Sequence, residues 1–239
     1  MNYHVFILCT LALTLGCFLQ SLIGFGMGVI AAPVILLLSP RLMPSIIIIM
    51  GTILSIIVLI QYRKHLDAKK LMTAFLGRIP GTFLAAYIML IVSKSEMFLI
   101  LGVTILITVL LSFKNIILTD NRTNLFIGGL FSGIMGTATG IGGPPIAILF
   151  QNENPNKLRA NLSAFFIVTN IISLGVLHYS GLFSFNDFKA SLIYLPIPII
   201  GIMVAYFIRN KINQKIIRLL ILLICSISAI ASLYQGFSI

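Results

Sequence analysis

Long apolar stretches separated by short polar ones run through the whole of this 239-residue chain. They are apolar on nearly all sides and lack the period-two alternation of a membrane β-barrel, so we predict helices in lipid. The pattern therefore predicts an all-α integral membrane protein. Its eight hydrophobic segments are Val5–Leu38, Met43–Gln61, Leu71–Val92, Met97–Phe113, Leu125–Phe150, Leu162–His178, Ala190–Ile208 and Ile216–Tyr234.

The composition supports a membrane location. Apolar residues make up 59% of the chain and charged residues only 9%, and the mean hydropathy is +1.12. At about 20 residues per crossing of a hydrocarbon core about 30 Å thick, the chain has room for about eight segments and short loops. We therefore expect a single multi-pass domain over residues 1–239 in the cell membrane, with no soluble catalytic domain.

Two glycine-rich stretches interrupt the first and fifth segments. Gly24-Phe25-Gly26-Met27-Gly28 lies in the first, and Gly140-Ile141-Gly142-Gly143-Pro144-Pro145 lies in the fifth. The first segment would be about 50 Å long as one helix, so it must tilt strongly, break or double back. Helix interruptions persist in lipid only where protein or an aqueous cavity surrounds the freed backbone groups, and a matched pair is typical of a transporter site.

The two halves of the chain repeat each other when one is displaced by about 116 to 119 positions. Gly24-Phe25-Gly26 then falls on Gly140-Ile141-Gly142, and Ala86-Tyr87 falls on Ala205-Tyr206. The common order of these matches favours a duplication of four segments, with repeat one over about residues 1–118 and repeat two over about 119–239. Chance similarity between helices rich in leucine and isoleucine is the alternative.

The basic residues distinguish parallel from inverted repeats. If all eight segments cross the membrane, the basic residues divide evenly between its two sides. An even division conflicts with the excess of Lys and Arg expected on the cytoplasmic side. If segments one and five double back as re-entrant hairpins, one side keeps only Arg41, Lys94 and Lys189. We favour this inverted arrangement with both chain ends outside, although Leu125–Phe150 also suffices to cross as one broken helix. The cytoplasmic residues are then Arg63, Lys64, Lys69, Lys70, Arg78, Lys114, Arg122, Lys157, Arg159, Arg209, Lys211, Lys215 and Arg218.

Charge and cysteine usage limit the other partners. The net charge of +11 comes from basic residues scattered between apolar runs, so we expect contact with the lipid bilayer and no nucleic-acid partner. The three cysteines lack the spacing of metal ligands, and we expect neither a metal nor a cofactor. All five acidic residues lie in or beside predicted loops, which argues against a carboxylate proton relay. The sequence leaves open whether the protein forms a homo-oligomer.

The candidate binding site is the backbone at the two breaks. A helix that restarts after a glycine presents free N–H groups and about half a positive charge, which suits sulfate-like and carboxylate-like groups. We predict that two such helix ends surround one anion without a buried basic side chain. The backbone candidates are Gly24, Gly26, Met27, Gly28, Gly140, Gly142, Gly143 and Pro144.

Side chains near the breaks are further candidates. Neutral groups can donate to an anion, although each can instead bond within or between helices; these are Gln20, Ser21, Thr137, Thr139 and Asn170. Arg78 is the only basic residue well inside an apolar segment. Two interpretations of Arg78 are open: attraction of the anion along a cytoplasmic path, or snorkelling toward the nearby interface, which we favour.

The glycine stretches, Ile79-Pro80-Gly81 and Arg159-Ala160-Asn161 resemble motifs of the TauE/SafE sulfite exporter family. The resemblance covers nearly the whole chain. It implies a membrane transporter of the 4-toluene sulfonate uptake permease type, not an enzyme, for small sulfur-containing anions such as sulfite, sulfoacetate or other organosulfonates. Met27 stands where many relatives have a third glycine, which implies a narrower or more apolar first half-site.

Three functions follow as hypotheses. We favour a secondary transporter that alternates access around the paired breaks. A passive anion channel using the same helix ends is the second, and a membrane enzyme or assembly factor without transport is the third. The sequence has no cluster of acids, bases, nucleophiles or metal ligands, which argues against the enzyme.

Overall fold

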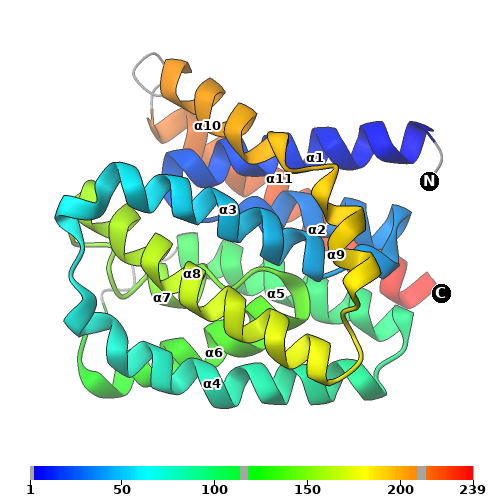
Figure 1. Cartoon of the computed structure of the whole chain (residues 1–239), viewed down its shortest axis with the longest axis horizontal. Helices are drawn as coiled ribbons and strands as arrows, with labels where there is room; N and C mark the ends of the chain where they lie inside the picture. Colours follow the sequence, from blue (N-terminus) through cyan, green and yellow to red (C-terminus); the bar gives the residue numbers. More distant parts are fainter. Residues whose placement is uncertain (1–2, 114–117, 209–213, 239) are drawn as a thin grey trace.

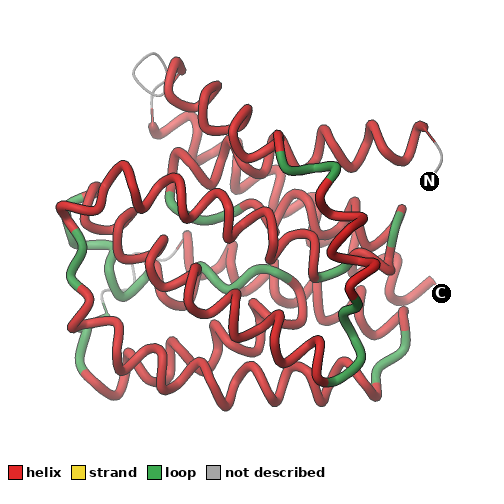
Figure 2. The backbone as a smooth tube through the Cα atoms, viewed as in Figure 1, coloured by secondary structure: helices red, strands yellow, loops and turns green. Residues whose placement is uncertain are grey.

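The computed structural model describes residues 3–113, 118–208 and 214–238. Within these ranges the chain is helical and has no strand, so the all-α prediction is confirmed (Figure 1). Short loops join the helices (Figure 2). Among the described residues, five helices are long and apolar enough to cross a membrane, or six if the bent pair Phe185–Leu192 and Pro196–Phe207 is one span.

Each α-helix overlaps one of the predicted segments, and the largest departures are at segment ends. The helices are α1 (Tyr3–Ile23), α2 (Met27–Leu38), α3 (Ser45–Tyr62), α4 (Ala68–Ile91), α5 (Lys94–Phe113), α6 (Arg122–Thr139), α7 (Pro144–Ala147), α8 (Pro155–Tyr179), α9 (Phe185–Leu192), α10 (Pro196–Ile208) and α11 (Gln214–Ser238), with short 3-10 helices at Pro40–Leu42 and Arg63–His65.

Local capping explains two of the departures. Helix α8 begins before the predicted Leu162, because the Asn154 side chain accepts a hydrogen bond from the Asn156 N–H at 2.9 Å and proline suits the first helical position. The segment predicted over Ala190–Ile208 divides into α9 and α10, which meet at 44°. A capping box between Ser184 and Asp187 starts α9 in a polar stretch that the apolar pattern leaves out.

The chain runs back beside the preceding helix after each glycine stretch. In the first half, a Cβ at Gly16 of α1 would lie 2.8 Å from the Met27 carbonyl oxygen. In the second half, a Cβ at Gly128 of α6 would lie 3.0 Å from the Pro145 carbonyl oxygen. Each glycine therefore permits a close approach between the two limbs that flank a break.

The main contacts between the two halves of the chain pair their helices. Helix α4 packs along α6, α1 packs along α10, α3 packs on α8, and α5 packs on α11. The last pair is in reciprocal contact, because a Cβ at Gly102 would lie 2.7 Å from Leu233 and a Cβ at Gly236 would lie 2.6 Å from Leu99. The two halves thus build one shared helix bundle.

The two ends of this bundle carry different ion pairs. Both chain termini lie at one end, and the connection from α3 to α4 lies at the other (Figure 1). Near the termini, Arg41 pairs with Asp187 at 3.0 Å. At the opposite end, an arrangement that we call the ion-pair cluster comprises Asp67, Lys70, Asp120, Glu153 and Lys157. Three residues of the sequence-based charge count, Lys114, Arg209 and Lys211, lie outside the described residues.

Candidate functional site

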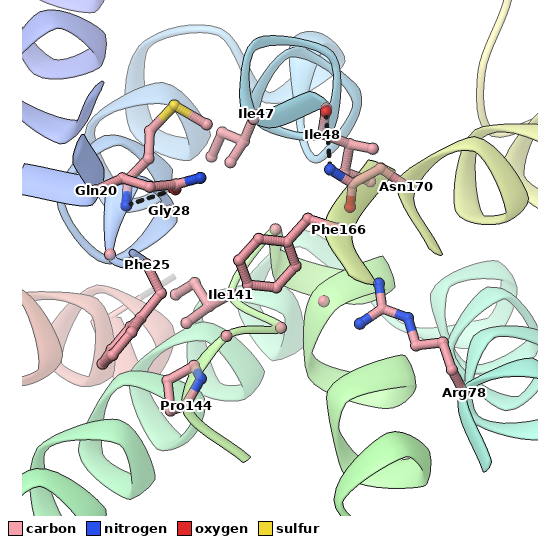
Figure 3. Close-up of a pocket in the computed structure, with 17 residues that line it drawn as sticks. Gln20, Phe25, Gly28, Ile47, Ile48, Arg78, Ile141, Pro144, Phe166 and Asn170 are labelled. Carbon is pink, nitrogen blue, oxygen red and sulfur yellow. Dashed lines mark hydrogen bonds between the residues drawn. The ribbon is translucent and has the colours of Figure 1, made fainter. Parts of the chain in front are cut away.

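A small cavity lies between the two glycine stretches (Figure 3). Its volume is about 30 Å³, which accommodates about two water molecules. Both stretches, α3, α4 and α8 contribute to its wall. The lining residues are Gln20, Phe25, Gly26, Met27, Gly28, Ile47, Ile48, Gly51, Arg78, Gly136, Gly140, Ile141, Gly142, Gly143, Pro144, Phe166 and Asn170.

The first break is held by an amide side chain from its own hairpin. Helix α1 ends at Ile23 and α2 begins at Met27. Between them, Gly26 has a φ of 120°, a backbone conformation that residues other than glycine rarely adopt. The Met27 N–H donates to Gln20 Oε1 at 3.3 Å. One amide at the start of α2 is therefore already paired with a neutral acceptor.

The second break has a different form. Gly140, with a φ of 76°, ends α6, and its N–H donates to the Gly136 carbonyl at 3.0 Å. The following helix α7 has only four residues. The prediction that a helix restarts here with about half a positive charge is wrong, because one turn aligns too few peptide dipoles.

The positive charge beside the second break comes instead from Arg78 of α4. Its side chain is only 1% exposed, so the interpretation that it snorkels to the interface is wrong. Arg78 Nη1 donates to the Ser132 carbonyl and to Ser132 Oγ at 2.6 Å, and Nη2 donates to Ser173 Oγ at 3.3 Å. A buried basic side chain therefore lines the candidate site, which the prediction of recognition by backbone groups did not include.

Arg78 has spare capacity to interact with an anion. Its Nε has no hydrogen-bond partner, and within the described residues no carboxylate pairs with its guanidinium. The Phe165 ring centroid lies 5.8 Å from Cζ, which adds only a weak cation–π contact. A buried charge without a counterion is costly, so this arrangement favours a ligand that brings a negative charge.

The other predicted side chains divide between the cavity and the helix interior. Asn170 lines the cavity and donates from Nδ2 to the Ile48 carbonyl at 3.3 Å (Figure 3). Ser21 donates to the Cys17 carbonyl at 2.7 Å, and Thr139 donates to the Met135 carbonyl at 2.6 Å, both within their own helices. These last two therefore follow the intrahelical alternative.

Two further candidates lie beside the cavity and do not line it. Thr137 Oγ1 lies 2.8 Å from Ser173 Oγ and donates to Thr82 Oγ1 at 3.3 Å, which links α4, α6 and α8. The Gly24 N–H donates to the Gln20 carbonyl at 2.7 Å and closes the end of α1. Both residues support the surrounding structure in this conformation.

Sequence reasoning missed the apolar wall and the serines that hold Arg78. Phe25 and Ile141 lie inside the glycine motifs, and their motif positions were a usable signal. Ile47, Ile48 and Phe166 are indistinguishable in sequence from lipid-facing residues. The remaining missed lining residues are Gly51 and Gly136, and the missed serines are Ser132 and Ser173.

Met27 gives the first half of the site an apolar surface. Its side chain is 1% exposed, its Sδ accepts a weak hydrogen bond from Cys17 Sγ at 3.4 Å, and its Cε would lie 3.3 Å from a Cβ at Gly51. It thus bridges α1 and α3. Within the described residues, no group of three or more His, Cys, Asp or Glu side chains is placed to hold a metal ion.

The Arg159-Ala160-Asn161 motif connects the first break with the ion-pair cluster. Arg159 Nη2 donates to the Leu22 carbonyl at 2.9 Å, which satisfies an acceptor at the end of α1. Asn161 Oδ1 accepts from the Asp67 N–H at 2.9 Å, and Nδ2 donates to Glu153 at 3.1 Å. These contacts tie the start of α8 to both halves of the chain.

Comparison with known proteins identifies the family of this apolar helical chain. The family model described as Sulfite exporter TauE/SafE matches residues 8–232. The chain belongs to the TauE/SafE sulfite exporter family. The resemblance stated from the motifs is therefore confirmed, and the protein is a multi-pass membrane transporter of this family. No curated protein and no solved structure matches the chain.

Proposed function

We propose that this protein is a secondary transporter that binds a small sulfur-containing anion, such as sulfite, sulfoacetate or another organosulfonate, in the cavity between its two glycine breaks. The observation that carries the proposal is the buried guanidinium of Arg78, which lines this cavity with its Nε unpaired and no carboxylate partner among the described residues. Membership of the TauE/SafE family supports an anionic substrate.

The chemistry of the cavity suits a sulfonate or sulfite oxygen. A guanidinium is a planar donor that binds oxyanions through two parallel N–H groups. The start of α2, which has 12 residues, adds a partial positive charge from the opposite side of the cavity. Gln20 and Asn170 offer neutral amides, so the site attracts an anion through few charges and can also release it.

The proposal places the two halves of the chain in inverted orientation. Exchanging the halves converts the α4–α6 pair into the α10–α1 pair and leaves the α3–α8 and α5–α11 pairs unchanged, which supports a twofold relation. Helix α1 begins at the end that holds both termini, whereas α6 begins next to Asp120 in the ion-pair cluster at the opposite end (Figure 1). The two hairpins therefore enter the membrane from opposite faces.

Ion pairs join different parts of the chain at both ends of the bundle in this conformation, which suits the two closures of a carrier. Arg41 and Asp187 join the end of the first hairpin to α9, and the ion-pair cluster joins the start of α4 to the segment after α7. In the proposed repeat register, Arg41–Asp187 corresponds closely to the Lys157–Asp67 pair of the cluster. In alternating access, one closure opens while the other stays shut, and the anion leaves on the open side.

Counterflow in proteoliposomes tests the proposal. Vesicles loaded with unlabelled anion should take up labelled anion faster than empty vesicles, with saturation, for at least one of sulfite, thiosulfate, sulfoacetate and taurine, with simple carboxylates screened alongside. A carrier must return with or without cargo, so trans-stimulation is its signature. A conductance without exchange would indicate the passive channel, and no flux of any tested anion would contradict transport of this class.

The ion-pair cluster allows a second prediction, about the cytoplasmic closure. Glu153 is its hub, because it accepts from Lys70 at 3.1 Å, from Lys157 at 3.2 Å and from Asn161 at 3.1 Å. Partly exposed ion pairs contribute up to about 1 kcal/mol each. We expect Glu153→Gln to raise the cytoplasmic accessibility of the cavity by about fivefold, because the substitution removes two such pairs.

Accessibility is measured as the rate at which an impermeant thiol reagent labels Ile141→Cys in a variant without the three native cysteines. Glu96→Gln is the matched control, because the hydrogen bonds of the Glu96 carboxylate in the described residues are local ones with Ser93, including one from the Ser93 N–H at 2.6 Å. Equal labelling rates in the Glu153→Gln and Glu96→Gln variants would show that the cluster does not hold the closure.

Proton concentration should have little effect on this closure near neutrality. A hydrogen bond from the Lys157 ammonium lowers the pKa of Asp67, and one from Lys70 lowers the pKa of Asp120. Carboxyls with lowered pKa values stabilise the closed form above their ordinary pKa of about 4, and that stabilisation is lost as pH falls through the lowered values. Because the thiolate is the reacting species, the labelling rate is divided by the thiolate fraction of the introduced cysteine at each pH, and this corrected rate should stay constant between about pH 5 and pH 8.

A further inference from the structure

Ser132 of α6 connects the buried cation to the second break. The side chain is fully buried. Its Oγ donates to the Gly142 carbonyl at 2.5 Å and accepts from Arg78 Nη1 at 2.6 Å. A hydroxyl has one proton, so its donation to Gly142 turns the oxygen lone pairs toward the guanidinium. Ser132 therefore fixes the position of Nη1 relative to the backbone of the break.

Two glycines complete the slot that holds the guanidinium. A Cβ at Gly136 would lie 2.7 Å from Arg78 Nη1, and a Cβ at Gly142 would lie 2.6 Å from the same atom. With Nη1 held by Ser132, the edge formed by Nε and Nη2 keeps hydrogen-bonding capacity, since Nε is unpaired and Nη2 has one 3.3 Å contact with Ser173. That edge has the two-pronged geometry that binds an oxyanion.

The first break has no equivalent of this arrangement. In the proposed repeat register, Ser132 corresponds to Gly16 and Arg78 corresponds to Ile197. Gly136 corresponds to Gln20, whose own amide pairs with the Met27 N–H. Gln20 and Arg78 lie on opposite sides of the cavity (Figure 3). The charged part of the site therefore lies beside the second break alone, although Arg78 itself comes from α4.

We infer that Ser132 is a positioning residue that orients Arg78 for anion binding and couples the occupied guanidinium to the Gly142 backbone. This inference rests on the proposed anion-transport function. An anion that binds the guanidinium pulls on a side chain that is tethered through Ser132 to the second break. Binding at Arg78 is thus transmitted directly to the hairpin.

The test compares Ser132→Ala, Ser132→Thr and a control, Ser191→Ala. Ser191 is equally buried, but its hydroxyl bonds only to the Asp187 carbonyl of its own helix, at 2.9 Å. Loss of a hydrogen bond to a charged group should raise the KM of Ser132→Ala for the transported anion roughly tenfold, with Vmax per folded protein little changed. Ser132→Thr keeps the hydroxyl and should restore most of the affinity, and the control should match wild type.

A second readout is independent of transport. Modification of Arg78 by phenylglyoxal, followed by mass spectrometry of its peptide, should be several-fold faster in Ser132→Ala, because Nη1 loses a tether. If the wild type transports none of the tested anions, the proposed function fails, while the modification rate still tests the tether. A transporting Ser132→Ala variant with wild-type KM and a wild-type modification rate would overturn the inference.

Discussion

Arg78→Gln should lower Vmax/KM for the transported anion by a factor of about 30 to several thousand. The substitution removes the buried positive charge of the cavity, and loss of one member of a buried charge pair costs about 2–5 kcal/mol of binding free energy. Folding should survive, because the charge that is removed has no carboxylate partner among the described residues and is costly to bury. Initial uptake rates over a range of anion concentrations measure the effect.

Two variants make this result specific. Arg78→Lys keeps the charge but loses the planar pair of donors, so its Vmax/KM should lie between those of wild type and Arg78→Gln. Arg122→Gln removes an exposed charge at the start of α6 and should leave uptake unchanged. Uptake by Arg78→Gln at the wild-type rate would show that the anion does not bind in this cavity.

Much of the fold could be predicted because lipid imposes a simple pattern. Long apolar runs predict helices, and the described helices lie mainly where those runs are. The glycine stretches could also be read, since Gly26 and Gly140 both have positive φ values that glycine adopts easily. The separate start of α9 could not be read from hydropathy, because a capping box between Ser184 and Asp187 sets it.

The position of Arg78 could not be predicted from its own segment. Its neighbours Ser132, Gly136 and Gly142 come from another segment, and only the packing of α4 on α6 brings them together. In an isolated helix the same arginine would be expected to reach for the interface. Three-dimensional packing therefore reverses an expectation that is reasonable for the sequence alone.

The short helix after the second break could likewise not be predicted, because the apolar run that contains it is compatible with a longer helix. The stretch after Pro145 is apolar enough for a longer helix, but it forms a single turn and its side chains enter the core. Ile146 and Phe150 are fully buried there and pack in a cluster with Phe165. In the proposed site, recognition at this break therefore depends on a side chain from α4 more than on a helix dipole.

Gly142→Val should abolish transport while leaving the protein in the membrane. Even the first carbon of a side chain at this position would lie 2.6 Å from Arg78 Nη1 and 3.0 Å from the Ser132 carbonyl oxygen. The guanidinium must move away, and it loses the slot that orients it. Overpacking of this kind costs about 1–3 kcal/mol of stability, which a membrane protein with a large helical core can tolerate. Counterflow and the amount of protein in the membrane are measured together.

Smaller substitutions separate space from backbone conformation at the two breaks. At Gly26 a Cβ would meet nothing within 4 Å, but the φ of 120° makes any side chain there strained, so Gly26→Ala should destabilise the hairpin by about 1–3 kcal/mol through its backbone alone. Gly142→Ala should impair transport through contact with Arg78. Gly175→Ala is the control, because its Cβ also enters open space, within regular helix.

Wild-type counterflow in Gly142→Val would contradict the placement of the anion site at the second break, because the substituted side chain cannot share that slot with Arg78.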